Sequence, residues 1–299
     1  MTKHAFGGPW TFVKLELLKR YLNFYTTALQ RQPFKRVYID AFAGTGECEI
    51  KLPDGSVSTI EGSAKIALEV TPAFDHVHLI DLKAKHAAAL QVLANAEDAG
   101  RVTVHRQDAN AALQSILSRT NWQSTRGVLF LDPYGMHVQW STLESIARTK
   151  ALDVWYLFPL SAVYRQAAKD MNKVDEAKAA ALDSVLGTTQ WREEFYADTK
   201  QESMLDDSGS RHKRTAGTAD IASFVHARLG SIFKGWVSEP VLLPENGPPM
   251  FALFFAVANP SETAVNLSNK GAQYLFGMHK AKKIGRTAES AIGQDSLFG

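Results

Sequence analysis

Short apolar runs and amphipathic segments alternate along the first half of the chain. Apolar residues recur every three to four positions over residues 10–30, which predicts a helix that ends before Pro33. Short runs rich in β-branched and aromatic residues follow, and helical patterns separate them. The predicted strands cover residues 37–41, 77–81, 102–105, 127–131 and 153–158, and the helices between them cover 61–70, 83–96, 109–118 and 138–149.

This alternation predicts an α/β, Rossmann-like fold, in which a mostly parallel sheet carries helices on both faces. Residues 47–60 predict a small hairpin inserted after the first strand. Further along, residues 161–233 predict a helical insertion with a polar break at 203–214. Two late strands, 236–243 and 250–258, complete a seven-stranded sheet whose last strand is antiparallel.

Length and composition fit one large domain. We expect residues 1–280 to form it and residues 281–299 to be a flexible polar tail. The chain is 45% hydrophobic and 21% charged, which is ordinary for a globular protein. The formal net charge is +2, so charge neither requires nor excludes a nucleic-acid partner.

Several classes of site and location are disfavoured. A single cysteine, Cys48, excludes an intramolecular disulfide and a cysteine-cluster metal site, and the nine histidines lack metal-ligand spacing. No apolar stretch approaches the ~20 residues of a membrane helix. No apolar signal segment follows Met1. We therefore expect a cytoplasmic protein with no metal and no membrane partner.

The first strand runs into a glycine turn that suggests a ligand site. Asp40 ends the strand, and Phe42, Gly44 and Gly46 follow in the pattern D-x-F-x-G-x-G. The dinucleotide fingerprint needs a third glycine, which is absent, so a nicotinamide-dependent oxidoreductase is disfavoured. The pattern resembles the S-adenosylmethionine (SAM) loop of class I methyltransferases. The alternative is a plain glycine turn after a buried strand.

Two further acids follow the next strands. Asp81 is suited to accept both ribose hydroxyls of SAM, and Asp108 to accept a hydrogen bond from its adenine amino group. The alternative for each is a helix N-cap, a position that aspartate favours.

The fourth strand closes on Asp132-Pro133-Tyr134-Gly135, which resembles the motif of amino-methyltransferases that act on nucleic-acid bases. An exocyclic base nitrogen is a poor nucleophile, because its lone pair is delocalised into the ring. The Asp132 carboxylate and a backbone carbonyl held by Pro133 can accept its N–H bonds, while Tyr134 stacks on the base. The alternative is a type I turn with proline at its second position.

Three basic features are open to two interpretations. Lys14 could reach a phosphate or the cofactor, but a solvated helical lysine is favoured. The basic runs at 211–214 and 279–286 could contact phosphates, and the alternative is a solvated surface.

The motifs together resemble the three-Cys-motif partner (TcmP) family over roughly residues 8–278. The resemblance is carried by WTFVKLELLKRYLNFY, YIDAFAGTGE, EGSAKIAL, LDPYG, WYLFPL and FFAVANP in this order. It implies a class I methyltransferase fold and a functional link to a separate three-Cys-motif protein. More distantly, the motif set resembles ribosomal RNA adenine-N6 methyltransferases.

Two hypotheses follow. The first is a SAM-dependent methyltransferase that acts on an exocyclic amine of a nucleic-acid base, RNA ahead of DNA. The second is a non-catalytic, phage- or defence-linked partner protein that keeps the fold and binds another protein.

Overall fold

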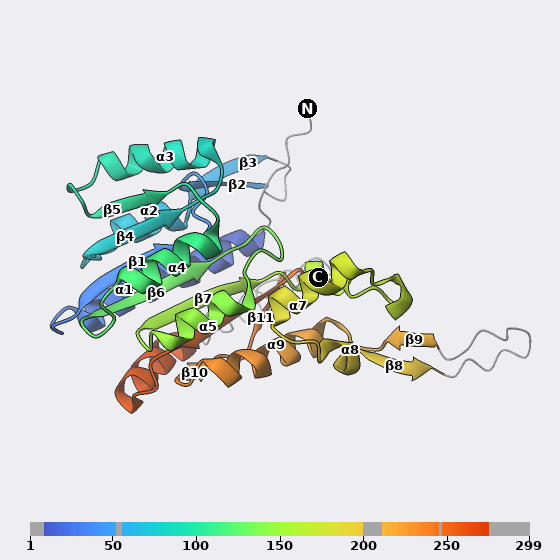
Figure 1. The fold of residues 1–299 in the computed structure, drawn as a ribbon. Helices are drawn as coiled ribbons and strands as arrows, with labels where there is room; N and C mark the ends of the chain where they lie inside the picture. Colours follow the sequence, from blue (N-terminus) through green and yellow to red (C-terminus); the bar gives the residue numbers. More distant parts are fainter. Residues whose placement is uncertain (1–8, 52–55, 200–210, 245–246, 275–299) are drawn as a thin grey trace, which may run out of the picture.

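A central sheet between two layers of helices forms the body of the molecule (Figure 1). The computed structural model describes residues 9–51, 56–199, 211–244 and 247–274. The eight strands of this sheet are β1 (Lys35–Asp40), β4 (His76–Ile80), β5 (Val102–His105), β6 (Thr125–Leu131), β7 (Leu152–Phe158), β10 (Trp236–Val237), β11 (Val241–Leu243) and β12 (Phe251–Val257).

The strand order identifies the fold. It runs β10-β12-β7-β6-β1-β4-β5, and β11 also pairs with β12. The five strands from β7 to β5 are parallel, whereas β12 is antiparallel to β7. An antiparallel β12 between β7 and the edge strands is the arrangement of class I methyltransferase sheets, so the predicted Rossmann-like fold class is confirmed. The order in which strands are added to the sheet switches between β1 and β6: β4 and β5 extend it on one side, and β6 and β7 on the other. Sheets of this kind bind ligands at such a switch point, beyond the carboxyl ends of the strands.

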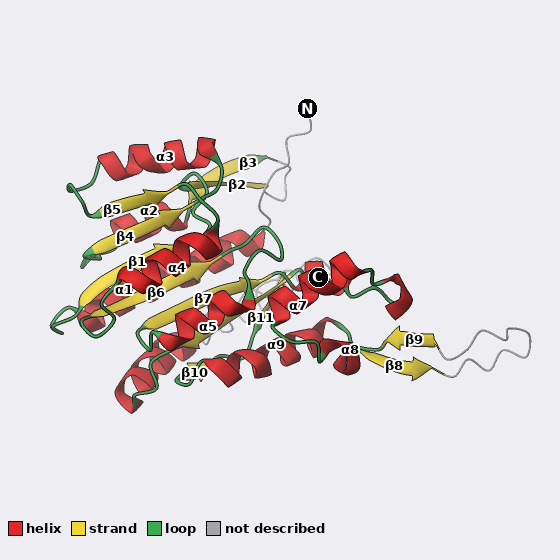
Figure 2. Cartoon of the chain, in the orientation of Figure 1, coloured by secondary structure: helices red, strands yellow, loops and turns green. Residues whose placement is uncertain are grey.

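Helices cover both faces of the sheet (Figure 2). One face packs against α1, α2, α3 and a helix over residues 262–274, and the other packs against α4, α5 and α9. The helices are α1 (Pro9–Leu29), α2 (Ser63–Glu69), α3 (Ala84–Asn95), α4 (Ala109–Arg119), α5 (Trp140–Arg148), α6 (Leu160–Gln166), α7 (Glu176–Leu186), α8 (Trp191–Glu194) and α9 (Thr218–Ile232), with a 3-10 turn η1 (Met171–Lys173).

The central strands are mostly apolar, because helices cover both faces of the sheet. In β6, Val128 and Phe130 join the core beneath α1, whereas Leu129 and Leu131 join the core beneath α4 and α5. All seven residues of β7 are buried, including the acid Asp153.

The insertion after β7 contains a hairpin as well as helices. β8 (Tyr196–Thr199) and β9 (Arg211–Arg214) pair antiparallel. The polar break predicted at 203–214 therefore includes a strand, within an insertion that is otherwise mostly helical. The sequence of β9 is entirely polar and has no apolar period to reveal a strand; it pairs through its backbone, and the His212 ring stacks on Tyr196 with centroids 5.9 Å apart.

The strand predicted over 236–243 is interrupted and forms β10 and β11. Pro240 has no N–H to give to the ladder. Ser238 instead bonds Phe255 twice: its N–H donates to the Phe255 carbonyl (2.8 Å), and its hydroxyl accepts from the Phe255 N–H (3.0 Å). The predicted tail and the basic run at 279–286 lie outside the described residues.

The predicted hairpin after β1 is confirmed as β2 (Glu47–Lys51) and β3 (Val57–Glu61), which pair antiparallel. It stands outside the central sheet, beside the carboxyl end of β1 (Figure 1).

Candidate active site

The turn after β1 exposes backbone at one of its two glycines. Gly44 has φ +63° and Gly46 has φ +84°, a left-handed region that side chains disfavour. A Cβ on Gly46 would lie 2.5 Å from the Leu93 Cδ1 atom, whereas a Cβ on Gly44 would meet no atom within 4 Å. The backbone at Gly44 is therefore open to a ligand, and Gly46 is needed for packing.

Asp40 lies beneath this turn and is fully buried. Its carboxylate accepts bonds from the Phe42 N–H (3.2 Å) and the Tyr38 hydroxyl (3.3 Å). Burial raises the pKa of Asp40 to about 7. The Phe42 side chain is half-buried and packs on the core beneath α4 and α5. This geometry suits Asp40 to shaping the turn from below.

Asp81, at the end of β4, joins two strand ends. Its Oδ2 atom accepts a bond from the Gly44 N–H (3.1 Å), and its Oδ1 atom accepts one from the Lys83 N–H (2.8 Å). The His86 Nδ1 atom lies 3.0 Å from Oδ2. With 6% of Asp81 exposed, the carboxylate is held by protein groups on both oxygens. His86 was not identified from the sequence. A signal was present, because His86 lies in the first turn of the predicted helix, five residues after the acid.

Asp108 caps α4, as the N-cap alternative proposed. Its Oδ1 atom accepts bonds from the N–H groups of Asn110 (2.9 Å) and Ala111 (3.1 Å). The residue is exposed, and both of these bonds fall on one oxygen. Capping therefore leaves Asp108 accessible at the end of β5.

Lys14 of α1 forms an ion pair with Asp132, the acid that follows β6. The two side chains are only 10% and 23% exposed. The interpretation of Lys14 as a solvated lysine is therefore wrong. A signal was present in the sequence, because Lys14 lies four residues before the buried Leu18 and so on the apolar face of the helix.

Tyr134 projects from the loop after β6. It is 54% exposed, and the Lys83 Nζ atom lies 4.8 Å from its ring centroid. Partial burial, together with the charges of Asp81 and Asp132, raises the pKa of Tyr134 to about 12. The phenol is thus neutral, and the β6 loop meets the β4 end. Pro133, between Asp132 and Tyr134, is buried.

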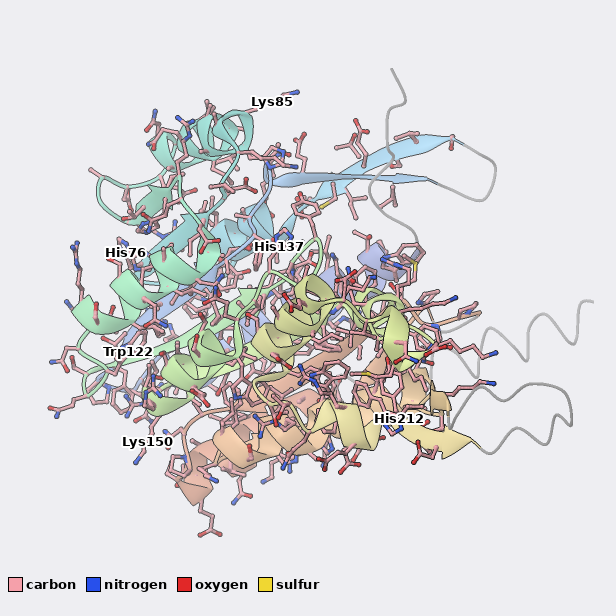
Figure 3. The ribbon with its side chains drawn as sticks, turned by 45° about the vertical axis from the view of Figure 1, so that its right-hand side comes forward. His76, Lys85, Trp122, His137, Lys150 and His212 are labelled. Atoms are coloured by element: carbon pink, nitrogen blue, oxygen red, sulfur yellow. The ribbon has the colours of Figure 1, made fainter. Side chains whose placement is uncertain are left out.

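Asn110 fixes the rest of the β6 loop, and sequence reasoning missed it. Its side-chain amide donates to the carbonyl of His137 (2.8 Å) and accepts from the Gln139 N–H (3.0 Å) and the Thr142 hydroxyl (2.9 Å). His137 marks this loop in Figure 3. No local pattern identifies Asn110, because its partners lie 27 to 32 residues ahead.

Cys48 of β2 shares this electrostatic environment. Burial raises the pKa of its thiol, the charge of Lys14 acts in the opposite direction, and those of Asp132 and Asp40 raise it further. The hairpin β2–β3 therefore borders the same group of charges.

Exposed apolar side chains gather around these strand ends. Leu82 follows Asp81, and Tyr134 follows Pro133. Tyr164 belongs to α6, which follows β7. Met250 is also exposed, and its carbonyl accepts a bond from the Ser161 N–H at the start of α6 (2.9 Å). Phe12 precedes Lys14 in α1 and is 56% exposed. Exposed apolar side chains thus lie next in sequence to, or in the same loop as, the acids Asp81 and Asp132.

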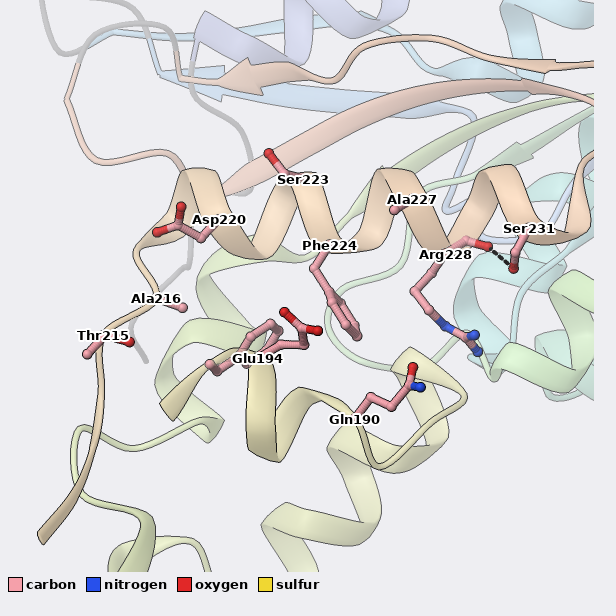
Figure 4. A pocket seen from close by; sticks show the side chains of 11 residues that line it. Gln190, Glu194, Thr215, Ala216, Asp220, Ser223, Phe224, Ala227, Arg228 and Ser231 are labelled. Atoms are coloured by element: carbon pink, nitrogen blue, oxygen red, sulfur yellow. Dashed lines mark hydrogen bonds between the residues drawn. The ribbon is translucent and has the colours of Figure 1, made fainter. Parts of the chain in front are cut away.

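A cavity of about 710 Å³ lies between α8 and α9, in the insertion (Figure 4). None of the predicted site residues lines it. Glu194 and Asp220 face it, and Asp220 also accepts a bond from the Gly217 N–H (2.8 Å). Arg228 is occupied by the carbonyls of Leu186 and Gly187.

The described part of the chain contains no helix long and apolar enough to cross a membrane. Among the described residues there is also no group of three or more histidine, cysteine or acidic side chains placed to hold a metal ion.

No family model and no curated protein sequence matches this chain. Among solved structures, protein LPL1258 from Legionella pneumophila str. Philadelphia 1 is similar at 13% identity and a TM-score of 0.45, over 88% of this chain and 92% of that chain. A proposed methyltransferase from Thermobifida fusca YX has 12% identity and a TM-score of 0.40, over 82% and 80% of the two chains. The N-methyltransferase NodS from Bradyrhizobium japonicum WM9 has 8% identity and a TM-score of 0.29, over 67% and 97%. The fold assignment rests on the strand order of the sheet.

Proposed function

We propose that this protein is a SAM-dependent methyltransferase that acts on an exocyclic amine of a nucleic-acid base, RNA ahead of DNA. The observation that carries the proposal is the joining of three strand ends at the switch point of a methyltransferase-type sheet. The open turn at Gly44 after β1 is bonded to Asp81 after β4, and the Lys83 ammonium after β4 lies 4.8 Å from the centroid of the Tyr134 ring after β6. Asp132, in the same loop as Tyr134, is paired with Lys14.

The residues present fit SAM. Gly44 offers backbone that a ligand can approach, because no atom lies where its side chain would be. Asp81 is the acid for the ribose hydroxyls, which would replace the contact with His86, and Asp108 is the acceptor for the adenine amino group. Asp40, Phe42 and Gly46 shape the turn beneath the cofactor. When bound, SAM supplies an electrophilic methyl group on sulfur.

Asp132, Pro133 and Tyr134 would serve the acceptor base. The Asp132 carboxylate accepts an N–H bond of the amine, which draws the nitrogen toward a tetrahedral form with an available lone pair. Asp132 would also take the surplus proton that the amine loses on receiving the methyl group. Lys14 holds this carboxylate in place, and the exposed Tyr134 ring stacks on the base.

Isothermal titration with SAM and with its demethylated product tests the proposal. Binding should be measurable at millimolar ligand. Asp81→Ala should weaken it more than Asp108→Ala, because Asp81 would accept two hydroxyl bonds and Asp108 only one, and charged hydrogen bonds contribute about 1.5–3 kcal/mol each. Asp98→Ala is the matched control, since Asp98 is an exposed acid in the loop before β5. No binding by the wild-type protein would end the enzyme proposal.

The protein-binding alternative keeps one observation in its favour. Both oxygens of Asp81 already accept bonds from this chain, so the acid has a structural role without a ligand. On this hypothesis the protein would bind a three-Cys-motif partner and ignore SAM. Nucleosides from cells with and without the protein, compared by mass spectrometry, distinguish the two functions.

A further inference from the structure

Two segments that are distant in sequence bring basic side chains to one surface of the insertion. β9 docks against the chain that follows α6: the Arg214 N–H donates to the Lys169 carbonyl (2.8 Å), and Lys213 forms a β-bridge with Asp170. We call this surface the β9 platform, and it comprises Tyr164, Arg165, Lys169, Lys173, Lys213 and Arg214.

Most cations of the β9 platform are available to a ligand. Arg165, Lys169 and Lys173 are exposed, and Lys213 is half-buried. None of these four forms an ion pair with another described residue. Of the acids in these segments, Asp175 pairs with Lys178, and Asp198 pairs with His212. Asp170 accepts a bond from the Asn172 N–H (3.0 Å) and offsets one of the platform's five positive charges. The platform therefore presents a net positive surface.

The β9 platform also offers an aromatic ring. The Arg214 guanidinium lies over the Tyr164 ring, 3.5 Å from its centroid, and donates to the Ala216 carbonyl (2.7 Å). Tyr164 is 37% exposed. Arg214 holds the Tyr164 ring in place, and the exposed part of the ring can stack on a base while the neighbouring exposed lysines attract phosphate.

The position of the platform connects it with the candidate active site. Its helix, α6, begins directly after β7, and β7 is the neighbour of β6, with Tyr156 paired to Leu131. Leu131 immediately precedes Asp132. A chain that lies along α6 and β9 thus leads toward the end of β6.

We propose that the β9 platform binds the backbone of a single-stranded nucleic acid and guides the target base to Asp132. This inference rests on the proposed function. A single strand is favoured over a duplex, because a paired base keeps its exocyclic amine inside the helix and stacks on its neighbours. Cationic tracks interleaved with rings are typical of proteins that bind single strands.

Fluorescence anisotropy with a labelled 20-nucleotide RNA of mixed sequence, and with DNA of the same sequence, tests this proposal. Lys169→Gln/Lys213→Gln should weaken binding about tenfold at 100 mM salt. It should also lower the slope of log affinity against log salt by about 1.4, since each lost contact to a single strand removes about 0.7. Comparing the RNA with the DNA shows which polymer is preferred.

Lys35→Gln/Lys150→Gln is the matched control. These two lysines are exposed and lie at the start of β1 and just before β7, at the amino ends of the strands, whereas the platform follows the carboxyl end of β7. It should change the affinity less than twofold. Tyr164→Leu should weaken binding through loss of stacking and leave the salt slope closer to that of the wild type. Circular dichroism checks that each variant is folded.

Three results would overturn the inference: no binding of either polymer by the wild type, equal effects of the platform and control variants, or an unchanged affinity of both platform variants. Titration of the same proteins with SAM separates this failure from that of the proposed function. SAM binding without platform-dependent nucleic-acid binding overturns only the platform, whereas loss of SAM binding in the wild type overturns the function.

Discussion

The pair of Lys14 and Asp132 is the residue-scale feature on which the candidate site depends most. An ammonium and a carboxylate that are both largely removed from water stabilise a fold only when each has its partner. Here the partners come from the first helix and from the loop after β6, 118 residues apart. The pair therefore holds α1 against the loop that carries Tyr134.

Lys14→Met should lower the free energy of unfolding by about 1–3 kcal/mol, because Asp132 is left as an unpaired, mostly buried carboxylate. Lys19→Met is the matched control in the same helix. Lys19 pairs with Glu61 at 3.2 Å with both side chains 46% exposed, and such a surface pair contributes less than about 1 kcal/mol. Urea unfolding measures both; equal losses would show that the buried pair does not stabilise the fold.

The next prediction concerns the chemical step. Asp132→Asn should slow methyl transfer roughly 10- to 150-fold, which corresponds to the loss of a charged hydrogen bond of about 1.5–3 kcal/mol in the transition state. SAM affinity should stay within about twofold of the wild type, because the proposed function places Asp132 against the acceptor amine and not against the cofactor. Tyr134→Ala should raise the KM for the nucleic-acid substrate by removing a stacking surface.

Rates and affinities of the two variants have to be compared once a substrate is found. If Asp132→Asn abolished SAM binding while Tyr134→Ala changed nothing, the loop would be a structural part of the cofactor site. The assignment of an amino-methyltransferase would then be wrong.

At the scale of elements, one buried acid connects three segments near the amino end of β7, opposite the candidate active site. Asp153 of β7 accepts hydrogen bonds from the Tyr21 hydroxyl of α1 and from the Ser268 hydroxyl of the helix over 262–274 (2.9 Å for Ser268). Burial raises the pKa of Asp153 to about 6.

This raised pKa predicts a pH dependence of stability. The folded carboxyl keeps its proton to a higher pH than the unfolded one, so ionisation favours the unfolded chain. Stability supplied by this group is complete below pH 3.8 and is lost as pH rises through about 6. Asp153→Asn, which cannot ionise, should therefore gain about 1–3 kcal/mol relative to the wild type between pH 4 and pH 8.

Urea unfolding of both proteins at several pH values checks this prediction. Burial lowers the pKa of His78 to about 3, which adds a pH dependence of opposite sign over part of the same range. That contribution is common to both proteins and cancels in their difference. A difference in stability that is constant with pH would show that folding does not raise the pKa of Asp153.

At the scale of the whole molecule, the sheet could be predicted because its strands carry their own signal. The central strands are buried on both faces, so residues 127–131 of β6 and 154–158 of β7 are uninterrupted apolar runs between helical patterns. Asp40, Asp81 and Asp132 could be placed at one end of the sheet from the sequence, because each comes at the carboxyl end of a predicted parallel strand. Their roles beyond that remain predictions.

What the sequence could not predict depends on partners far along the chain. The pairing of Lys14 with Asp132 and the bonds of Asp153 to Tyr21 and Ser268 each span more than 100 residues. Local periodicity contains no information about such contacts. The strand β9 was missed for another reason: its polar sequence has neither apolar alternation nor a buried face.

The last prediction concerns the insertion, which shares its core with the sheet. Leu182 of α7, Trp191 of α8 and Ile221 of α9 belong to the same buried cluster as Leu129 of β6 and Phe158 of β7. An insertion without a core of its own has no reason to unfold separately. We therefore expect one cooperative transition, in which the fluorescence of Trp191, obtained by comparison with Trp191→Phe, coincides with far-ultraviolet circular dichroism.

Leu182→Ala should shift both signals together and lower the free energy of unfolding by about 2–4 kcal/mol, because it opens a cavity in the shared core. Val92→Ala is the control: Val92 is 70% exposed, and its truncation should cost less than about 0.5 kcal/mol. If Leu182→Ala moved only the Trp191 signal, the insertion would be an independent domain. The β9 platform would then lie on a unit able to move relative to the strand ends, and its guidance of a base toward Asp132 would no longer follow from the fold.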